Sequence, residues 1–288
     1  TTDRNRTSPF AFTGNKFEFR SVGSSQSIAT PNFIINTIVA ETLSQIADRL
    51  EKAEDFKAEV NAVVKEIIRN HKRIIFNGNN YSEEWVAEAE RRGLPNLKST
   101  VDAIPVLVEE KNIKVLEKHG VLNRAEVHSR YEICLENYIK TIRIEALTMI
   151  EIASRQILPA SLAYVRKVAD TVASLNAANT DSSFVKGELD KLVSLTSGLK
   201  AAIEKLGVKI EEIDASEGDS LEHARAYKDV IIPLMDELRT VPTSLKPWWM
   251  QACGQCPPME ISCLVSSDKN LFDKNDEPSM KARFYIKC

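Results

Sequence analysis

The sequence predicts a mainly α-helical protein, in which a helical bundle follows one short strand and one helix. From about residue 56 to residue 241, apolar residues recur at helical spacing between short breaks. Only residues 16–20 alternate strictly between charged and aromatic side chains, which is the pattern of a strand. With 288 residues, of which 43% are hydrophobic, the chain is long enough to bury one large core or two smaller ones.

The predicted strand runs from Lys16 to Arg20. Its alternation places Lys16, Glu18 and Arg20 on one face and the two phenylalanines on the other. A polar turn at residues 23–27 follows, and then Pro31 precedes a helix. Helical spacing of apolar residues predicts this helix: Ile34, Ile35, Ile38, Val39, Leu43, Ile46, Ala47 and Leu50.

The predicted bundle is interrupted wherever glycine, proline or asparagine gather. These breaks are Asn77–Asn80, Gly93–Pro95, Pro105, Gly120, residues 176–182, Gly207 and Gly218. Ser82 is expected to cap one helix, and Asn123 with Glu126 has the spacing of a capping box. The capping box should begin the longest helix, which Pro159 then bends or ends. A further helix is expected over residues 224–238.

Charge and hydropathy exclude two classes of partner. The 38 Lys and Arg and the 41 Asp and Glu are interspersed and give a net charge of -3, so we expect no nucleic-acid partner. No run of 18 apolar residues and no secretory signal occurs, so we expect a cytoplasmic protein without a membrane partner. The chain has no initiator methionine, and we expect it to be a fragment of a longer protein.

The strand face of Lys16, Glu18 and Arg20 is the strongest chemical arrangement in the sequence. A carboxylate flanked by two cations, each about 7 Å away, suits a hard metal ion that bridges bound anions. An exposed strand whose charges pair with their neighbours would show the same alternation. Spacing alone leaves both interpretations open.

These residues also carry a family resemblance. Asn5-Arg6-Thr7-Ser8, followed by Gly14-Asn15-Lys16-Phe17-Glu18-Phe19-Arg20, is similar to the glutamine synthetase pattern Asn-Arg-Ser and then Arg-Ile-Glu-x-Arg. The residues around these motifs resemble the type III class of glutamine synthetases. The resemblance covers about residues 4–241 and includes Phe76-Asn77-Gly78, Tyr81 to Trp85, Arg92 to Asn96, Ser129 to Glu132 and Leu158 to Ala160.

The resemblance implies ATP-dependent condensation of glutamate with ammonia through a γ-glutamyl phosphate. It implies that Glu18 binds one divalent metal ion, Mg²⁺ or Mn²⁺, and that Arg20 holds the glutamate substrate. It further implies that Lys16 contacts the ATP phosphates and that Arg6 lies near the transferred phosphoryl group, as a catalytic and ATP-binding residue. Family members assemble into rings, so the resemblance also implies a homo-oligomer.

The resemblance divides the chain into three parts. Residues 1–55 would be the C-terminal strip of an α+β catalytic domain, ending in its last strand and helix, and residues 56–241 the helical type III C-terminal domain. Other classes place a second arginine where this chain has Ala11, so a cation must come from elsewhere or the loop aligns differently. The remaining metal ligands of the family lie upstream of residue 5, and the fragment alone should be inactive.

Histidine and cysteine do not point to a second site. The four histidines, His71, His119, His128 and His223, have no ligand spacing and are expected to be structural, and Cys134 is expected in the core. Cys253 and Cys256 form a single C-x-x-C pair, but a zinc site needs a second pair at matching spacing.

Residues 242–288 differ abruptly from the bundle, with four of the five cysteines and two of the three tryptophans. Trp248-Trp249-Met250 requires the codons TGG TGG ATG, which in a shifted frame encode Val-Asp. The same shift allows Trp-Pro-x-Pro-x-Tyr further on, which is close to the end of type III glutamine synthetases. We therefore predict that one base is missing near the codon after Val241, and that the resulting tail is poorly packed.

One alternative from another class remains open. With most of the chain in a bundle, it could be a non-catalytic module for interaction or oligomerisation, or the product of a decayed gene. The nucleotide sequence on both sides of the chain distinguishes these readings.

Overall fold

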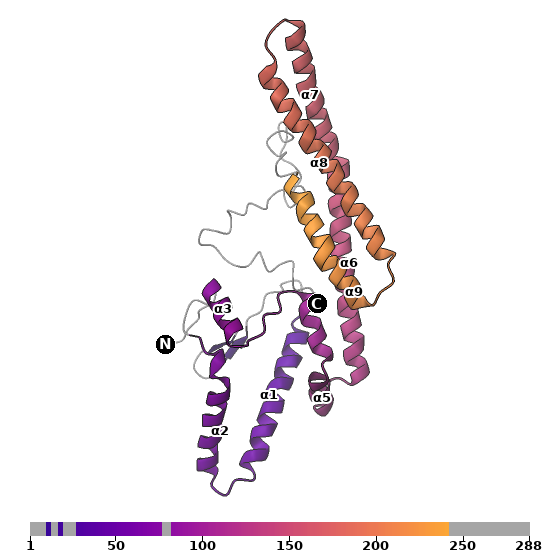
Figure 1. The fold of residues 1–288 in the computed structure, drawn as a ribbon. Coiled ribbons are helices and arrows are strands. Elements are labelled where there is room, and N and C mark those ends of the chain that lie inside the picture. Colours follow the sequence, from indigo (N-terminus) through magenta and orange to yellow (C-terminus); the bar gives the residue numbers. More distant parts are fainter. Residues whose placement is uncertain (1–9, 13–16, 20–26, 77–81, 242–288) are drawn as a thin grey trace. The chain divides into compact units, whose positions relative to one another are not determined.

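The computed structural model describes residues 10–12, 17–19, 27–76 and 82–241, the first two ranges by their backbone alone. Helices make up almost all of this part of the chain, as Figure 1 shows, so the predicted mainly α class is confirmed. Contacts divide the described chain into two units, which meet in the sequence between Cys134 and Leu135. The predicted tail at residues 242–288 lies outside the described residues.

A two-stranded antiparallel sheet stands at the start of the described chain. Strand β1, Phe10–Phe12, pairs with β2, Phe17–Phe19. In this register Ala11 lies opposite Glu18. The alternation at residues 16–20 predicts β2, whereas the three residues of β1 are too few for a period of two to be recognised.

The first unit continues with helices that follow one another closely. They are α1 (Ala29–Leu50), α2 (Phe56–His71), η1 (Lys72–Ile74), α3 (Glu83–Arg91), α4 (Thr100–Ala103), η2 (Ile104–Val108) and α5 (Glu110–Lys118). Helix α1 begins two residues before Pro31 rather than after it. A proline in the first turn is tolerated because its missing N–H has no partner there.

The core of the first unit lies where α5 meets the start of α6 (Arg124–Ile152). Ile113, Leu116 and Val127 are at most 5% exposed there. The hydrophobic residues Phe33, Leu107, Val108 and Leu122 pack against them. Because Phe33 belongs to α1, this cluster attaches α1 to the helices that follow it.

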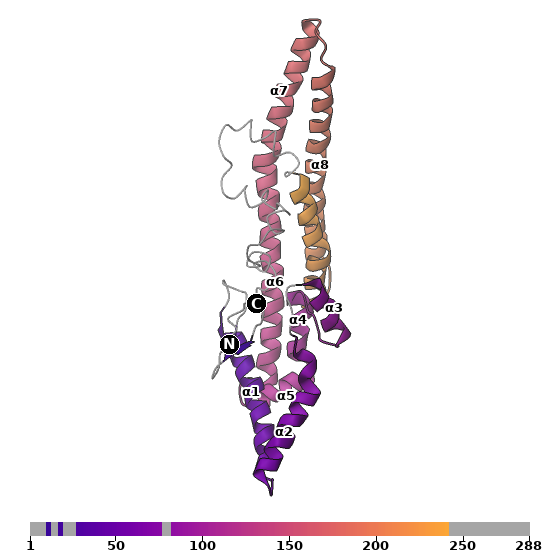
Figure 2. The ribbon, with the colours of Figure 1, turned by 90° about the vertical axis from the view of Figure 1, so that its left-hand side faces the viewer.

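The second unit is a set of long helices. It contains the part of α6 (Arg124–Ile152) from Leu135 onward, η3 (Ala153–Ile157), α7 (Leu158–Ala177), α8 (Ser183–Asp214), α9 (Ser220–Ala226) and η4 (Tyr227–Ile231), and then helical residues 232–241. The two views of Figures 1 and 2 show α7 and α8 side by side as a hairpin. Helix α8 has 32 residues and α6 has 29, but the helix that begins with α6 continues through η3 and α7 to Ala177 and is the longer one.

The helix does not end at Pro159, but its backbone hydrogen-bonding pattern changes just before this residue. The five residues before Leu158 form a π-helical segment, so the chain stays helical from α6 through η3 into α7. The buried residues Ala153, Ile157 and Ser161 are spaced four residues apart. In a regular α-helix each such step rotates the buried face by about 40°, and the wider π turn absorbs this rotation. The segment therefore keeps one face of α6 and α7 toward the same neighbour.

Two of the predicted breaks at glycine coincide with a positive φ angle, and one lies inside a continuous helix. Gly120 has a φ of 62° and ends α5, and Gly93 has a φ of 68° after α3. The predicted break at Gly207 is wrong, since α8 passes through it. Gly207 instead faces Ile150, whose Cδ1 lies 3.9 Å from the position that a Cβ would occupy. Packing there offsets the low helix propensity of glycine.

The predicted caps are confirmed. Ser82 Oγ accepts a hydrogen bond from the Trp85 backbone N–H at 3.4 Å. Asn123 and Glu126 form a reciprocal pair, with the Glu126 N–H donating to Asn123 Oδ1 at 2.9 Å and the Asn123 N–H donating to Glu126 Oε2 at 2.8 Å. Each cap satisfies backbone donors that the first helical turn leaves unpaired.

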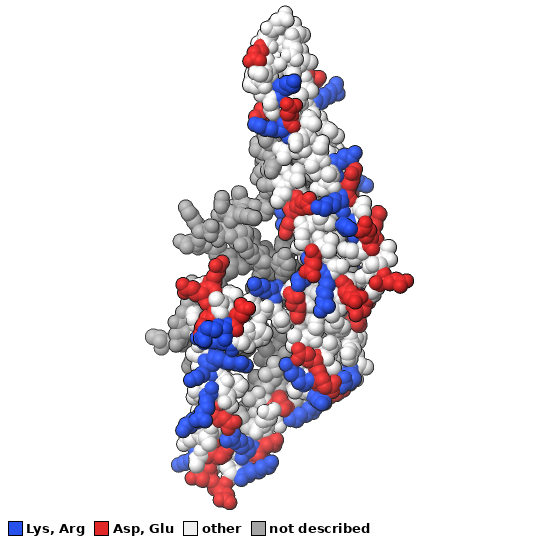
Figure 3. Space-filling view, viewed as in Figure 1, with Lys and Arg blue, Asp and Glu red and all other residues white. Residues whose placement is uncertain are grey.

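Charged side chains cover the helices in mixed signs. On the face seen in Figure 3, Lys and Arg alternate with Asp and Glu over the described parts of both units. Many of them form ion pairs one helical turn apart, such as Lys140 with Glu136 at 2.7 Å. In the described part of the chain, no helix combines the length and the apolar character needed to cross a membrane.

Candidate functional site

The four residues that the resemblance assigns to an active site lie at or beyond the edge of the described chain. Glu18 is the central residue of β2. Arg6, Lys16 and Arg20 fall outside the described residues, and so do the side chains of both strands. The predicted convergence of these residues on one face therefore stays a prediction.

The described residues do not by themselves fit the divalent metal that the resemblance implies. Among the side chains that the structure describes, no group of three or more His, Cys, Asp and Glu is placed to hold a metal ion. A hard cation such as Mg²⁺ or Mn²⁺ needs several oxygen ligands. Glu18 could supply one of them, and the others would have to come from beyond the described chain.

Helix α1, which follows β2, is held by a charged cluster at Glu41. The Glu41 carboxylate lies 2.7 Å from Lys118 Nζ and 2.8 Å from His119 Nε2, and it accepts a hydrogen bond from Gln45. The Glu41 side chain is only 16% exposed. The hydrogen bonds from Lys118, Gln45 and His119 lower the pKa of Glu41 to about 2. This cluster ties α1 to the end of α5.

A second ion pair joins α1 to α2. Arg49 Nε lies 2.5 Å from Glu59 and Arg49 Nη1 lies 2.6 Å from Glu66. Both carboxylates belong to α2 and lie seven residues, or about two turns, apart. The hydrogen bonds to Glu66 and Glu59 raise the pKa of Arg49, whose charge therefore persists at any working pH. Helix α1 is thus connected to the helices that follow it at two places.

Three positions quoted for the family resemblance come together in the first unit. The rings of Phe76 and Trp85 stack with centroids 4.2 Å apart and an angle of 25° between their planes. The guanidinium carbon of Arg92 lies 5.6 Å from the centre of the Trp85 ring, within the range of a cation–π contact. Although Phe76 and Arg92 are 16 positions apart in the sequence, both stack on the ring of Trp85.

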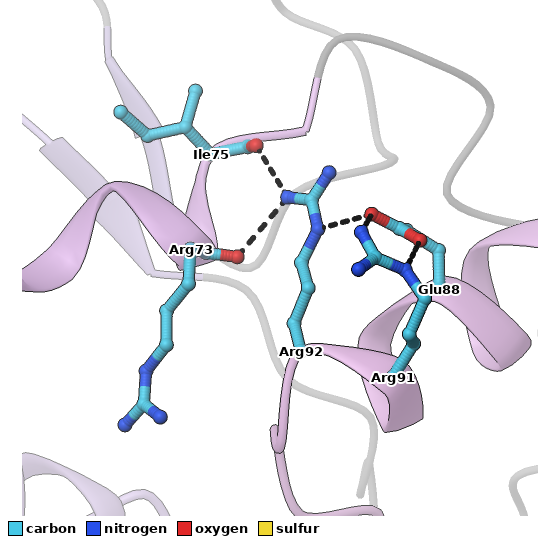
Figure 4. A network of polar contacts seen from close by, with 5 residues as sticks. All are labelled: Arg73, Ile75, Glu88, Arg91 and Arg92. Carbon is cyan, nitrogen blue, oxygen red and sulfur yellow. Dashed lines mark hydrogen bonds and ion pairs between the residues drawn. The ribbon is translucent and has the colours of Figure 1, made fainter.

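Arg92 also holds the backbone before this stack, as Figure 4 shows. Its Nη1 donates to the carbonyl oxygens of Arg73 at 3.1 Å and Ile75 at 2.9 Å, and its Nε donates to Glu88 at 2.6 Å. Glu88 accepts two more hydrogen bonds from Arg91. The hydrogen bonds from Arg91 and Arg92 lower the pKa of Glu88 to about 2.

We call Phe76, Trp85, Glu88 and Arg92 the arginine junction. It joins Phe76 to α3, the helix that carries Trp85. A planar guanidinium suits this task, since it can stack on a ring and donate in its own plane at once. The junction is built for positioning. Phe76, Trp85 and Arg92 belong to the stretches that carry the family resemblance, whereas Glu88 does not, and no local pattern in the sequence indicates the partners of Arg92.

The histidines and Cys134 occupy unremarkable surroundings. His119 pairs with Glu41, and His223 Nε2 lies 3.1 Å from both Oγ and the carbonyl oxygen of Ser216. His71 and His128 are exposed, and Cys134 is half-buried on α6.

Comparison with known proteins finds similarity along most of the chain. Residues 59–176 match the family model described as glutamine synthetase C-terminal domain. The chain is 39% identical over 249 residues to the type-3 glutamine synthetase of Dictyostelium discoideum. It is 37% identical over 243 residues to a glutamine synthetase of Butyrivibrio fibrisolvens, and 31% identical over 249 residues to one of Bacteroides fragilis.

Each of these alignments covers 83% of this chain and 34% of the relative. The chain therefore spans about a third of the length of the curated relatives that it matches. An alignment over 83% of the chain is longer than either unit, so it includes residues of both units.

Proposed function

We propose that this chain, which belongs to the type III class of the glutamine synthetase family, forms part of an enzyme that ligates ammonia to glutamate with ATP. The observation that carries the proposal is the similarity to three glutamine synthetases over 83% of the chain. The motif with Lys16, Glu18 and Arg20 supports it independently, since these residue types suit a site for phosphate, metal and carboxylate.

In the proposed reaction the γ-carboxylate of glutamate attacks the γ-phosphorus of ATP, and ADP leaves. Ammonia then attacks the acyl carbon of γ-glutamyl phosphate, phosphate leaves, and ammonia's extra proton is released. A bound divalent metal would neutralise charge on the phosphates. Glu18 would contribute one oxygen ligand to it, Arg20 would hold the glutamate carboxylate, and Lys16 and Arg6 would hold phosphoryl oxygens.

The helical region would support this site without taking part in the chemistry. We propose that residues 1–55 belong to the catalytic domain and residues 56–241 form the type III C-terminal domain. The Glu41 cluster and the Arg49 pairs connect α1 to α5 and α2, so they would hold the end of the catalytic strip to the helices. We further propose a homo-oligomer in the cytoplasm, as the family resemblance implies.

The test uses the gene product that contains this chain together with the coding sequence upstream of it. Glutamine formation from glutamate, ammonia and ATP is measured in the presence of Mg²⁺ or Mn²⁺. We expect Glu18→Gln to lower kcat at least a hundredfold at saturating metal. Arg20→Lys should raise KM for glutamate, whereas Lys16→Gln should raise KM for ATP.

A matched control is Glu136→Gln, which removes a carboxylate exposed on α6 and one pair with Lys140. It should leave the kinetics unchanged, because a single surface pair contributes little. If Glu18→Gln behaves like Glu136→Gln, Glu18 is not a metal ligand. If the upstream sequence encodes no further glutamate ligands, the alternative of a non-catalytic helical module is favoured instead.

A further inference from the structure

Helix α1 follows the strand that carries Glu18 and connects it to the rest of the first unit. The helix begins at Ala29, ten positions after Phe19, the last residue of β2. The clusters at Glu41 and Arg49 hold the middle and the end of α1. Neither cluster includes a residue of the first turn, which is the end of α1 that lies nearest to β2 in the sequence.

The first half of α1 is held at Phe33. This side chain packs against three buried residues of α5 and α6, namely Ile113, Leu116 and Val127. The guanidinium carbon of Arg130, on α6, lies over the Phe33 ring at 5.8 Å from its centre, within the range of a cation–π contact. Because Phe33 is only half-buried, the core covers the ring in part and the guanidinium covers it further.

The contact at Phe33 is the first of a line of contacts along α1. Phe33, Thr37 and Glu41 are spaced by four residues and therefore lie on one face of the helix. Thr37 is 5% exposed, and its Oγ1 donates a hydrogen bond to the carbonyl oxygen of Phe33 at 2.6 Å. Phe33 is thus the member of this line that comes closest in sequence to the strand.

Arg130 is committed to the ring rather than to an ion pair. It is exposed on α6, and within the described part of the chain it forms no ion pair, whereas Arg124 near the start of the same helix is bound by Glu110. Arg130 also belongs to the stretch Ser129 to Glu132, which carries the family resemblance. The proposed site gives this stretch no role.

The distance of Phe33 from the other contacts gives it leverage over the strand. From Glu41 to Ala29 the helix is about 18 Å long, because each residue adds about 1.5 Å. A tilt of about 10° around Glu41 would therefore move the first residue of α1 by about 3 Å. Misplacing an active-site group by about 1 Å can cost about a hundredfold in rate. The contact at Phe33, about 12 Å from Glu41, restrains this tilt.

We propose that Arg130 is a positioning residue for the active-site strand. By holding the Phe33 ring against the core, it fixes the first half of α1 and, through it, the strand that carries Glu18. The helical region thereby contributes a residue on which the rate of the reaction depends, although Arg130 touches no substrate. The inference rests on the proposed function, which assigns Glu18 to the metal ion.

The test uses the gene product that contains this chain together with the coding sequence upstream of it. Arg130→Gln removes the cation and keeps a similar helix propensity. The matched control is Lys140→Gln, which removes an exposed cation of the same helix that pairs with Glu136. Arg130→Gln should lower kcat for glutamine formation about tenfold, because the strand is misplaced. Lys140→Gln should leave kcat unchanged, and equal kcat values for the two variants would overturn the proposal.

A general loss of stability would not produce this result. Losing an exposed cation–π contact changes the folding equilibrium only about twofold to fivefold, so either variant stays almost entirely folded. Arg130→Lys keeps a cation at the ring and should recover most of kcat. Arg130→Met keeps only an apolar stem and should not. Equal kcat values for the Lys and Met variants would contradict a role for the cation at the ring.

A second measurement needs no activity. Hydrogen exchange of the backbone amides of residues 32–38 is followed by mass spectrometry in the same protein. Arg130→Gln should speed their exchange about threefold, because the cation–π contact no longer opposes local opening, and Lys140→Gln should not. Unchanged exchange in this segment would overturn the proposal. If the unsubstituted protein makes no glutamine, the proposed function fails, and the exchange rates still decide whether Arg130 holds α1.

Discussion

Tyr227 offers a change of one atom whose effect can be worked out from the structure. This residue lies in η4 and is only 1% exposed. Its hydroxyl donates to Asp214 Oδ1 at 2.5 Å, and Asp214 Oδ2 lies 2.7 Å from Nε of Arg143. The substitution Tyr227→Phe removes the hydroxyl and leaves the packing of the ring unchanged.

The expected loss follows from the partners of that hydroxyl. A hydrogen bond to a charged group contributes about 1.5–3 kcal/mol to stability. The Asp214 side chain is 32% exposed, so water can replace part of the lost interaction, and it keeps Arg143. We therefore expect Tyr227→Phe to lower the free energy of unfolding of the second unit by about 1.5 kcal/mol.

Urea unfolding at pH 7, followed by circular dichroism at 222 nm, measures this loss. The matched control is Tyr164→Phe on α7, since Tyr164 is half-buried and its hydroxyl has no hydrogen bond to another described residue. The control should change stability by less than about 0.5 kcal/mol. Equal effects of the two substitutions would refute the reasoning.

The same residue predicts a dependence on alkaline pH. Burial first, and then the hydrogen bond to Asp214, raise the pKa of Tyr227 above its ordinary value of 10.0. Because the folded state favours the neutral phenol, this stabilisation is complete below about pH 10 and is lost as the pH rises above it. Stability of the unsubstituted chain should therefore fall faster above pH 10 than that of Tyr227→Phe, and parallel profiles would contradict the assigned cause.

Three further changes test other parts of the structure. Arg92→Lys should lower stability by about 1–2 kcal/mol, because lysine cannot stack on a ring and donate to two carbonyls together; unchanged urea midpoints would show that the arginine junction is not needed. The pKa of Glu41 is about 2, below its ordinary value of 4.5, so its interaction with Lys118 stabilises the fold above pH 4.5 and is lost as the pH falls toward 2. Glu41→Gln should flatten the acid limb of a stability profile, and an unaltered limb would assign it to other carboxylates. Leu206→Ala, at a side chain with no exposure, should cost about 2–5 kcal/mol by thermal unfolding, and a loss below 1 kcal/mol would mean that the site collapses to fill the cavity.

Local interactions explain why much of the fold could be predicted. The caps at Ser82 and Asn123 involve residues three positions apart, so both partners stand together in the sequence. Helical periodicity likewise depends on neighbours within two turns. The prediction failed at Gly207, where a contact with Ile150 from 57 residues earlier decides that the helix continues.

The candidate site shows the opposite situation. Glu41 and His119 are separated by 78 residues, and neither their spacing nor their composition indicates that they meet. The partners of Arg92 include two backbone carbonyls, which carry no signature in the sequence at all. Glu18 could be singled out, because alternation along a strand and the resemblance around it both depend on residues close by.

By itself, the sequence determined the helical class, the family, the caps and the strand that carries Glu18, since each rests on residues within a few positions of one another. Only the tertiary structure decided that Pro159 is accommodated by a π-helical segment, that Phe76, Trp85 and Arg92 stack on one another, and that Gly207 packs against Ile150. Those features depend on which distant helices pack together. Side chains far apart in the chain meet because burying apolar surface brings their helices into contact, and no local pattern records the meeting.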